Sequence, residues 1–257
     1  MGMRERFQAN MAGNRAYRAH AHANRLNDTG KPAEAEKLYA DAMRGYLEAE
    51  KQNCENPRLM TGFSVLLMRE GQYEKARDIL LKLYQNPSLS QDDKFHLRIN
   101  HSICQWKLGN LDKAIESMRS AFSFAKTSLC YNVYCAMLNE KARETGDFGE
   151  AEDLCAQALG YDEEDTATLT NAGLLRYWKY EKTGDPADLA EAVKRFEKAV
   201  KRNPNYPTAL VGLSLAEHAI GNAQDAKAHI DRALALRFPA SSAIDKAFAQ
   251  EAAKKIG

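Results

Sequence analysis

The stretch NAGLLRYWKYEKTGDPADLAEAVKRFEKAVKRNP, residues 171–204, decides the fold of this chain. Its second half carries Ala192, Phe196 and Ala199, which are separated by four and then three positions. Residues spaced in this way share one stripe of an α-helix. The two small residues allow a neighbouring helix to approach closely, and the large one fills the remaining gap. Gly184 separates this helix from the amphipathic stretch before it, and glycine tolerates the positive φ of a tight turn after a helix end. The stretch is therefore predicted to be a helix, a turn and a second helix.

This pattern recurs six times along the chain. Each copy has a glycine followed by an alanine, and the pairs are Gly30 with Ala35, Gly71 with Ala76, Gly109 with Ala114, Gly146 with Ala151, Gly184 with Ala192, and Gly221 with Ala226. Successive alanines are 41, 38, 37, 41 and 34 residues apart. The excesses over 34 are close to whole helical turns of about 3.6 residues, so they lengthen a helix without rotating its buried stripe. Because one such unit cannot bury its apolar face alone, we expect the units to stack along the chain.

The repeats resemble those of the tetratricopeptide repeat family from near Ala16 to Pro239. The best match is formed by Asn171, Ala172, Gly173, Ala192, Phe196, Ala199 and Pro204. The usual small residues of the pattern are replaced elsewhere by Ala23, Ser64, Ser102, Asn139, Ser214 and Leu83. The resemblance implies an all-α, right-handed superhelical solenoid of about six helix-turn-helix repeats. We expect a single solenoid domain over 1–257, with an N-terminal basic segment or cap at 1–15, repeats at 16–239 and a C-terminal capping helix at 240–257.

Two interpretations of the N-terminal segment remain open. Residues 1–25 carry five arginines against Glu5 alone, and Phe7 and Met11 are spaced to form a small apolar stripe on a helix. The segment is either a cap packed on the first repeat or a contact for an anionic surface or nucleic acid.

Composition narrows the class of protein. The 257 residues contain 36 Lys and Arg against 35 Asp and Glu, a net charge of +1, which argues against a protein dominated by nucleic-acid binding. There is no apolar run of 18 residues and no secretory signal, so we expect no membrane span. Five cysteines without a Cys-x-x-Cys spacing predict scattered reduced thiols and a cytoplasmic location.

The resemblance implies a groove lined by the first helix of each pair. Mapped onto this sequence, it gives as peptide-binding residues Asn24, Arg58, Val65, Met68, Arg69, Ile99, Ile103, Trp106, Lys107, Glu140, Leu174 and Tyr177. Arg143 and Leu215 also fall at groove positions. A carboxylate clamp of the kind found in some family members is not expected, because only Asn24 matches its five positions.

The apolar members of this set are interpreted in two ways. Val65, Met68, Ile99, Ile103 and Trp106 would form an exposed patch that binds a peptide with apolar anchors and some acidic character. Alternatively, superhelical curvature or the C-terminal helix buries them as ordinary core.

The sequence contains no catalytic motif. A phosphate-binding loop, GxGxxG, HExxH and GxSxG are all missing, so we expect no catalytic residue, metal or cofactor. The predicted function is a non-enzymatic scaffold or adaptor that binds a protein or peptide partner in its groove, with self-association as a further option and no nucleic acid. The alternative is a peptide-responsive regulatory protein that acts on an effector.

Overall fold

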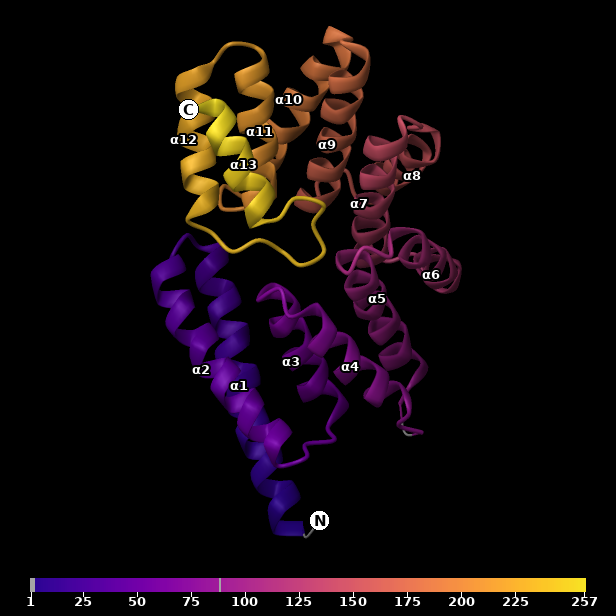
Figure 1. The fold of residues 1–257 in the computed structure, drawn as a ribbon, viewed down its shortest axis with the longest axis vertical. Coiled ribbons are helices and arrows are strands. Elements are labelled where there is room, and N and C mark those ends of the chain that lie inside the picture. Colours follow the sequence, from indigo (N-terminus) through magenta and orange to yellow (C-terminus); the bar gives the residue numbers. More distant parts are fainter. Residues whose placement is uncertain (1–2, 88) are drawn as a thin grey trace. The chain divides into compact units, whose positions relative to one another are not determined.

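The structure, a computed structural model, describes residues 3–87 and 89–257. Met1 and Gly2 of the predicted N-terminal segment lie outside the described residues. Thirteen helices make up the regular structure of these ranges, which confirms the all-α prediction (Figure 1). The chain divides into two compact units, Met1–Ser117 and Met118–Gly257. One continuous solenoid over 1–257 remains a prediction.

The first unit is built from antiparallel helix pairs. Its helices are α1 (Met3–Asp28), α2 (Pro32–Lys51), α3 (Pro57–Arg69), α4 (Tyr73–Tyr84) and α5 (Gln91–Lys107), and α6 (Leu111–Phe124) contains the boundary between the units. Helix α1 packs along α2 and against α3, and α3 packs against α4 and α5. Because α1 is continuous from Met3 to Asp28, the described part of the N-terminal segment is the beginning of the first repeat helix.

The second unit continues the same design. Its helices are α7 (Ser128–Thr145), α8 (Gly149–Tyr161), α9 (Thr166–Thr183), α10 (Pro186–Arg202), α11 (Pro207–Ala219), α12 (Ala223–Leu234) and α13 (Lys246–Ile256). The first helices of successive pairs lie side by side, since α7 packs against α9 and α9 against α11. Helix α13 packs against α12 and α11, so it covers the end of the array as predicted, although it begins at Lys246 rather than near 240.

The six repeat glycines confirm the predicted turns. Each of them adopts a left-handed backbone, with φ between 72° and 88°. A side chain beyond Cα is strained in this region, so glycine ends one helix and allows the next to turn back. Side-chain caps mark the beginnings of other helices, such as the Ser90–Asp93 capping box of α5 and the Asp165 cap of α9.

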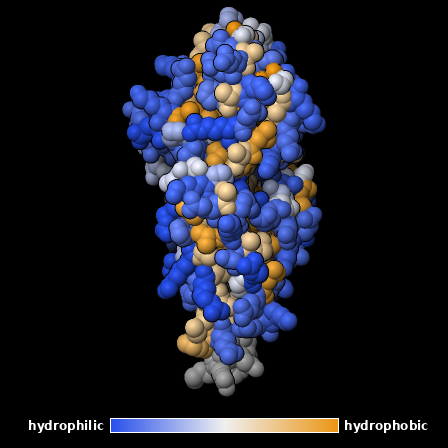
Figure 2. Space-filling model, turned by 90° about the vertical axis from the view of Figure 1, so that its left-hand side faces the viewer, coloured by the Kyte–Doolittle hydropathy of each residue, from blue (hydrophilic) through white to orange (hydrophobic). Residues whose placement is uncertain are grey.

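The alanine stripe forms the interior as its spacing predicts. The six anchor alanines are buried, and so are the large residues that follow them, including Tyr39 in unit 1 and Phe196 in unit 2. All five cysteines are buried and free, in agreement with the scattered thiols that the sequence predicts. On the face shown in Figure 2, apolar side chains occur in small separate groups among polar ones. Over the described residues, no helix combines the length and the apolar character needed to cross a bilayer.

Candidate groove site

A cavity lies on the inner face of the second unit. Its volume is about 320 Å³, and four helices contribute side chains to it: α7, α9, α11 and α13. The lining residues are Arg143, Tyr177, Glu181, Leu215, Phe248, Glu251, Ala252 and Lys255. The first helices of three repeats and the capping helix therefore converge on one concave site.

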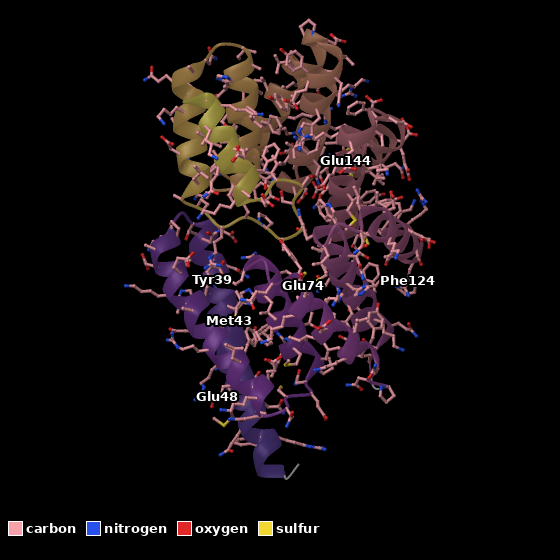
Figure 3. The ribbon with its side chains drawn as sticks, viewed as in Figure 1. Tyr39, Met43, Glu48, Glu74, Phe124 and Glu144 are labelled. Carbon is pink, nitrogen blue, oxygen red and sulfur yellow. The ribbon has the colours of Figure 1, made fainter. Side chains whose placement is uncertain are left out.

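Arg143 is held at this cavity by two aromatic rings. Its guanidinium carbon lies over the ring of Trp178 at 5.3 Å and over the ring of Phe248 at 5.0 Å. Trp178 comes from α9 and Phe248 from α13, so the capping helix supplies one of the two rings that contact this α7 side chain. Glu144, the next residue along α7, marks this last turn in Figure 3. Cation–π contacts of this kind contribute about 0.5–2 kcal/mol each, depending on their exposure.

No acidic side chain of the described residues forms an ion pair with Arg143. An arginine normally satisfies its five N–H donors with carboxylates, carbonyls or water. Here the aromatic rings occupy the flat face of the group, and its N–H edge has no anionic partner. The contact holds the side chain in place and leaves its donors available.

The aromatic floor of the cavity is buried. Tyr177 is 7% exposed, and burial, reinforced by the hydrogen-bonded Glu181 carboxylate, raises the pKa of its hydroxyl. Trp178 is 1% exposed, and its indole N–H has no acceptor within the described part of the chain. The ring of Tyr177 thus gives the cavity a buried apolar wall, and Trp178 supports Arg143 from beneath.

The predicted groove residues of the second unit differ in whether they line the cavity. Tyr177 lines the cavity, as a groove residue should. Leu174 is fully buried between helices and offers no surface. Glu140 is half-buried on α7 and is not among the lining residues. Peptide contact by any of them remains a prediction.

In the first unit, the expected exposed apolar patch is wrong. Met68, Ile99, Ile103 and Trp106 are all at least 97% buried, and Val65 is half-buried. Helix α3 packs against α5, and apolar side chains on these facing helices are removed from water by packing. The alternative interpretation, ordinary core, is the one that the structure supports.

The polar residues of the first unit that were assigned to the groove are engaged within it. Arg69 donates to Asn24 Oδ1 at 2.7 Å and to the Tyr39 hydroxyl at 2.9 Å, and Tyr39 donates to the same Asn24 oxygen (Figure 3 labels Tyr39). Arg58 lies 4.7 Å over the ring of Tyr17. The last member of the set, Lys107, lies 4.0 Å over the Trp106 ring. Their contact with a peptide remains a prediction.

Sequence reasoning missed the roles of Phe248 and Lys255. Both lie on the capping helix, outside the repeats, and no repeat position signals that this helix reaches the groove. The only available signal was the groove position of Arg143, whose aromatic partners come from two other helices.

Comparison with protein families agrees with this architecture. Residues 187–243 match the tetratricopeptide repeat family, and they include nearly all of α10, the whole of α11 and α12, and the glycine turn at Gly221. The C-terminal part of the second unit therefore carries the tetratricopeptide repeat pattern. Comparison with curated proteins gives no match.

Solved structures show the same fold at low sequence identity. A thermophilic tetratricopeptide repeat protein of Thermus thermophilus, TTC0263, is 18% identical with a TM-score of 0.55, and the match covers 69% of this chain and 90% of that one. IFIT1 in a monomeric mutant form with Gppp-AAAA is 15% identical with a TM-score of 0.60, over 80% of this chain and 48% of that one. The human IFIT1 dimer with PPP-AAAA is 14% identical with a TM-score of 0.57, over 86% and 60%. This chain thus spans only part of the IFIT1 chain.

Proposed function

We propose that this chain is a non-enzymatic protein-interaction scaffold that binds a peptide segment of its partner on the inner face of the second unit. The observation that carries the proposal is the cavity in which Arg143 is fixed by Trp178 and Phe248 without an anionic partner. Tetratricopeptide repeats present preformed concave surfaces of this kind to proteins. Binding sites are usually largely preformed, apolar and equipped with a few placed polar groups.

A peptide suits the dimensions of this site better than a folded surface does. The cavity of about 320 Å³ accommodates one or two side chains, so it anchors a segment whose remainder runs along the helices outside it. Anchoring of this kind buries little area, and we expect micromolar affinity, about −8 kcal/mol.

RNA is a less favoured ligand for this chain. Two of the similar structures are IFIT1 with Gppp-AAAA or PPP-AAAA, but at 14–15% identity they support the fold alone. The net charge of +1 supplies no basic excess for phosphate backbones. A triphosphate-ended tetra-adenylate added as a competitor is expected to leave peptide binding unchanged.

A peptide-display selection on the full chain tests the proposal. Selected peptides should bind the wild type and lose at least tenfold in affinity for Ala252→Leu, because the larger side chain fills the cavity from α13. Ala247→Leu makes the same change at an exposed site on α13 and should bind normally. Selection of no peptide, or equal binding by both variants with unchanged helical circular dichroism, contradicts the proposal.

A further inference from the structure

Around the groove cavity of the second unit, the acidic side chains have partners within the chain, whereas the basic side chains form no ion pair with a described residue. Its lining contains two cations, Arg143 and Lys255, and two carboxylates, Glu181 and Glu251. Glu251 forms an ion pair with Lys254 at 2.6 Å, and Glu181 interacts with the Tyr177 hydroxyl. Neither lining cation forms an ion pair with a described residue, although Lys255 lies near enough to Glu251 to lower the pKa of that carboxyl. The engaged anions and available cations give the site a preference for a negatively charged group.

The two aromatic rings that hold Arg143 fix the direction in which its guanidinium can bind an anion. Its guanidinium lies over the rings of Trp178 and Phe248, and its N–H donors lie in the plane of the group. Because the group is already positioned, less conformational entropy is lost when it binds a ligand. A planar fork of donors matches a carboxylate in a bidentate arrangement, which a lysine does not reproduce.

The rest of the lining selects for an apolar neighbour of that anion. Leu215, Phe248 and Ala252 surround the cavity, and Tyr177 forms part of its buried floor. An ion pair formed beside these side chains is less screened by solvent than one on an open surface. Glu181 and Glu251 at the same cavity disfavour a dianion, so a phosphate group suits the site less well than a carboxylate.

We infer that the groove cavity of the second unit recognises a carboxylate next to an apolar side chain in a peptide, with Arg143 as the residue that holds the carboxylate. This inference rests on the proposed function and specifies its ligand. The carboxylate is that of a Glu or Asp side chain within the peptide, and a free C-terminus is the competing source that the experiment separates.

Titration calorimetry on the full chain with four probes tests the inference. The probes are Ac-Leu-Glu-Leu-Leu-NH2, its Gln counterpart with the same caps, the Gln peptide with a free C-terminal carboxylate, and inorganic phosphate. We expect the Glu peptide to bind at least tenfold more tightly than the capped Gln peptide, and phosphate to bind more weakly than the Glu peptide. Preference for the free C-terminus over the Glu peptide assigns the carboxylate to a chain end.

Variants locate the effect at Arg143. Arg143→Met keeps an apolar stem on the two rings and should reduce the Glu-to-Gln ratio to below threefold, and Arg143→Lys should give an intermediate ratio. Arg232→Met, an exposed arginine on α12, should retain the full ratio. In a Trp106→Phe background, emission from Trp178 should change on binding, which places the ligand beside the ring under Arg143.

The outcomes distinguish the inference from the proposed function. Equal binding of the Glu and Gln peptides, or a full ratio in Arg143→Met, overturns the carboxylate assignment and leaves peptide binding intact. If Arg143→Met does not fold, an affinity for the Glu peptide that is unchanged between 50 and 500 mM salt overturns the assignment instead. Failure of these probes together with failure of the display selection overturns both proposals.

Discussion

Arg69 in the first unit and Arg143 in the second occupy the last turn of the first helix of their repeats, but their surroundings differ. Arg69 donates hydrogen bonds to Asn24 and Tyr39, so it connects α3 with α1 and α2. Arg143 lies over the rings of Trp178 and Phe248 and has no ion pair among the described residues. The same residue type at a similar repeat position therefore holds helices together in one unit and remains available for a ligand in the other.

The difference follows from the neighbours rather than from the repeat. In the first unit, the polar side chains of Asn24 and Tyr39 supply acceptors within reach of the guanidinium. In the second, aromatic rings from α9 and α13, helices that follow Arg143 in the chain, contact the guanidinium without using its N–H donors. A groove position in the repeat identifies a candidate, and the surrounding helices decide whether it is available.

The largest effect is expected where the second unit depends on apolar packing alone. Phe196 is fully buried, and its ring fills the space left by Gly173 and Gly212, since a Cβ on Gly173 would lie 2.6 Å from the ring. Phe196→Ala should lower the free energy of unfolding by about 3–5 kcal/mol, through lost burial and the cavity left behind. Urea unfolding followed by circular dichroism measures the loss.

Hydrogen exchange locates this effect within the molecule. Protection should fall in α9, α10 and α11, which pack together, and hardly at all in α1–α4. As a control, Phe124→Ala removes the same kind of side chain at 65% exposure and should cost less than about 1 kcal/mol. Equal losses for the two variants contradict the packing role of Phe196.

A smaller effect separates the two arginines directly. Arg69→Met leaves Asn24 and Tyr39 without a charged hydrogen-bond donor, and this should cost about 1.5–3 kcal/mol of stability. Arg143→Met removes no hydrogen bond to another described residue and retains an apolar stem on the rings, so it should cost about 1 kcal/mol or less. Thermal and urea unfolding of the two variants give the comparison, and a larger loss for Arg143→Met would reverse the roles that we assign.

Much of the fold could be predicted because its determinants are local. Gly109 and Gly184 lie at turns where a left-handed backbone is required, and the alanine stripe around Ala192 repeats with helical spacing. Such signals depend on the geometry of one hairpin, and each repeat shows them again.

The site was less predictable because it depends on contacts between distant segments. Nothing in the sequence near Trp106 indicates that its ring is buried, since inner-face burial depends on the packing of neighbouring helices. The contact of Phe248 with Arg143 joins residues 105 positions apart through the capping helix. Tyr177 was identified correctly as a groove residue because its position in the repeat also places it at the cavity in the structure.

The two units also differ in the buried thiols of their inner helices. In the first unit, burial raises the pKa of Cys104 to about 12 from the ordinary 9.0, whereas in the second Cys135 is buried in contact with Cys155. The folded pKa of Cys104 lies above the unfolded one, so its stabilising contribution is complete below pH 9 and is lost as the pH rises toward 12. Between pH 8 and pH 10 the loss from this thiol should be about 1.4 kcal/mol.

Urea unfolding of the wild type and of Cys104→Ala at both pH values isolates this contribution. The variant is less stable at pH 8 because of the lost side chain, but its stability should fall less steeply with pH. Parallel pH profiles for the two proteins contradict the assignment. The native wild type should also react slowly with thiol reagents, because all five cysteines are buried.

The smallest effect concerns two tyrosines of α2 that differ only in their hydroxyl partners. The Tyr39 hydroxyl takes part in the network with Asn24 and Arg69, whereas the Tyr46 hydroxyl is buried without a partner among the described residues. Tyr46 stacks on Phe63 with a centroid distance of 5.4 Å, and this contact does not require the hydroxyl.

Tyr46→Phe should therefore leave stability unchanged or raise it by up to about 1 kcal/mol, because a buried donor without an acceptor is costly. Tyr39→Phe should lower stability by about 1 kcal/mol, since it removes two hydrogen bonds of the network. Each substitution removes one tyrosine hydroxyl from α2. The changes in the free energy of unfolding should therefore have opposite signs, and urea unfolding then measures the polar network of the first unit separately from its packing. A loss of more than about 1 kcal/mol in Tyr46→Phe would mean that its hydroxyl has a hydrogen-bond partner in solution, such as water, and would place a second polar contact next to Gly62.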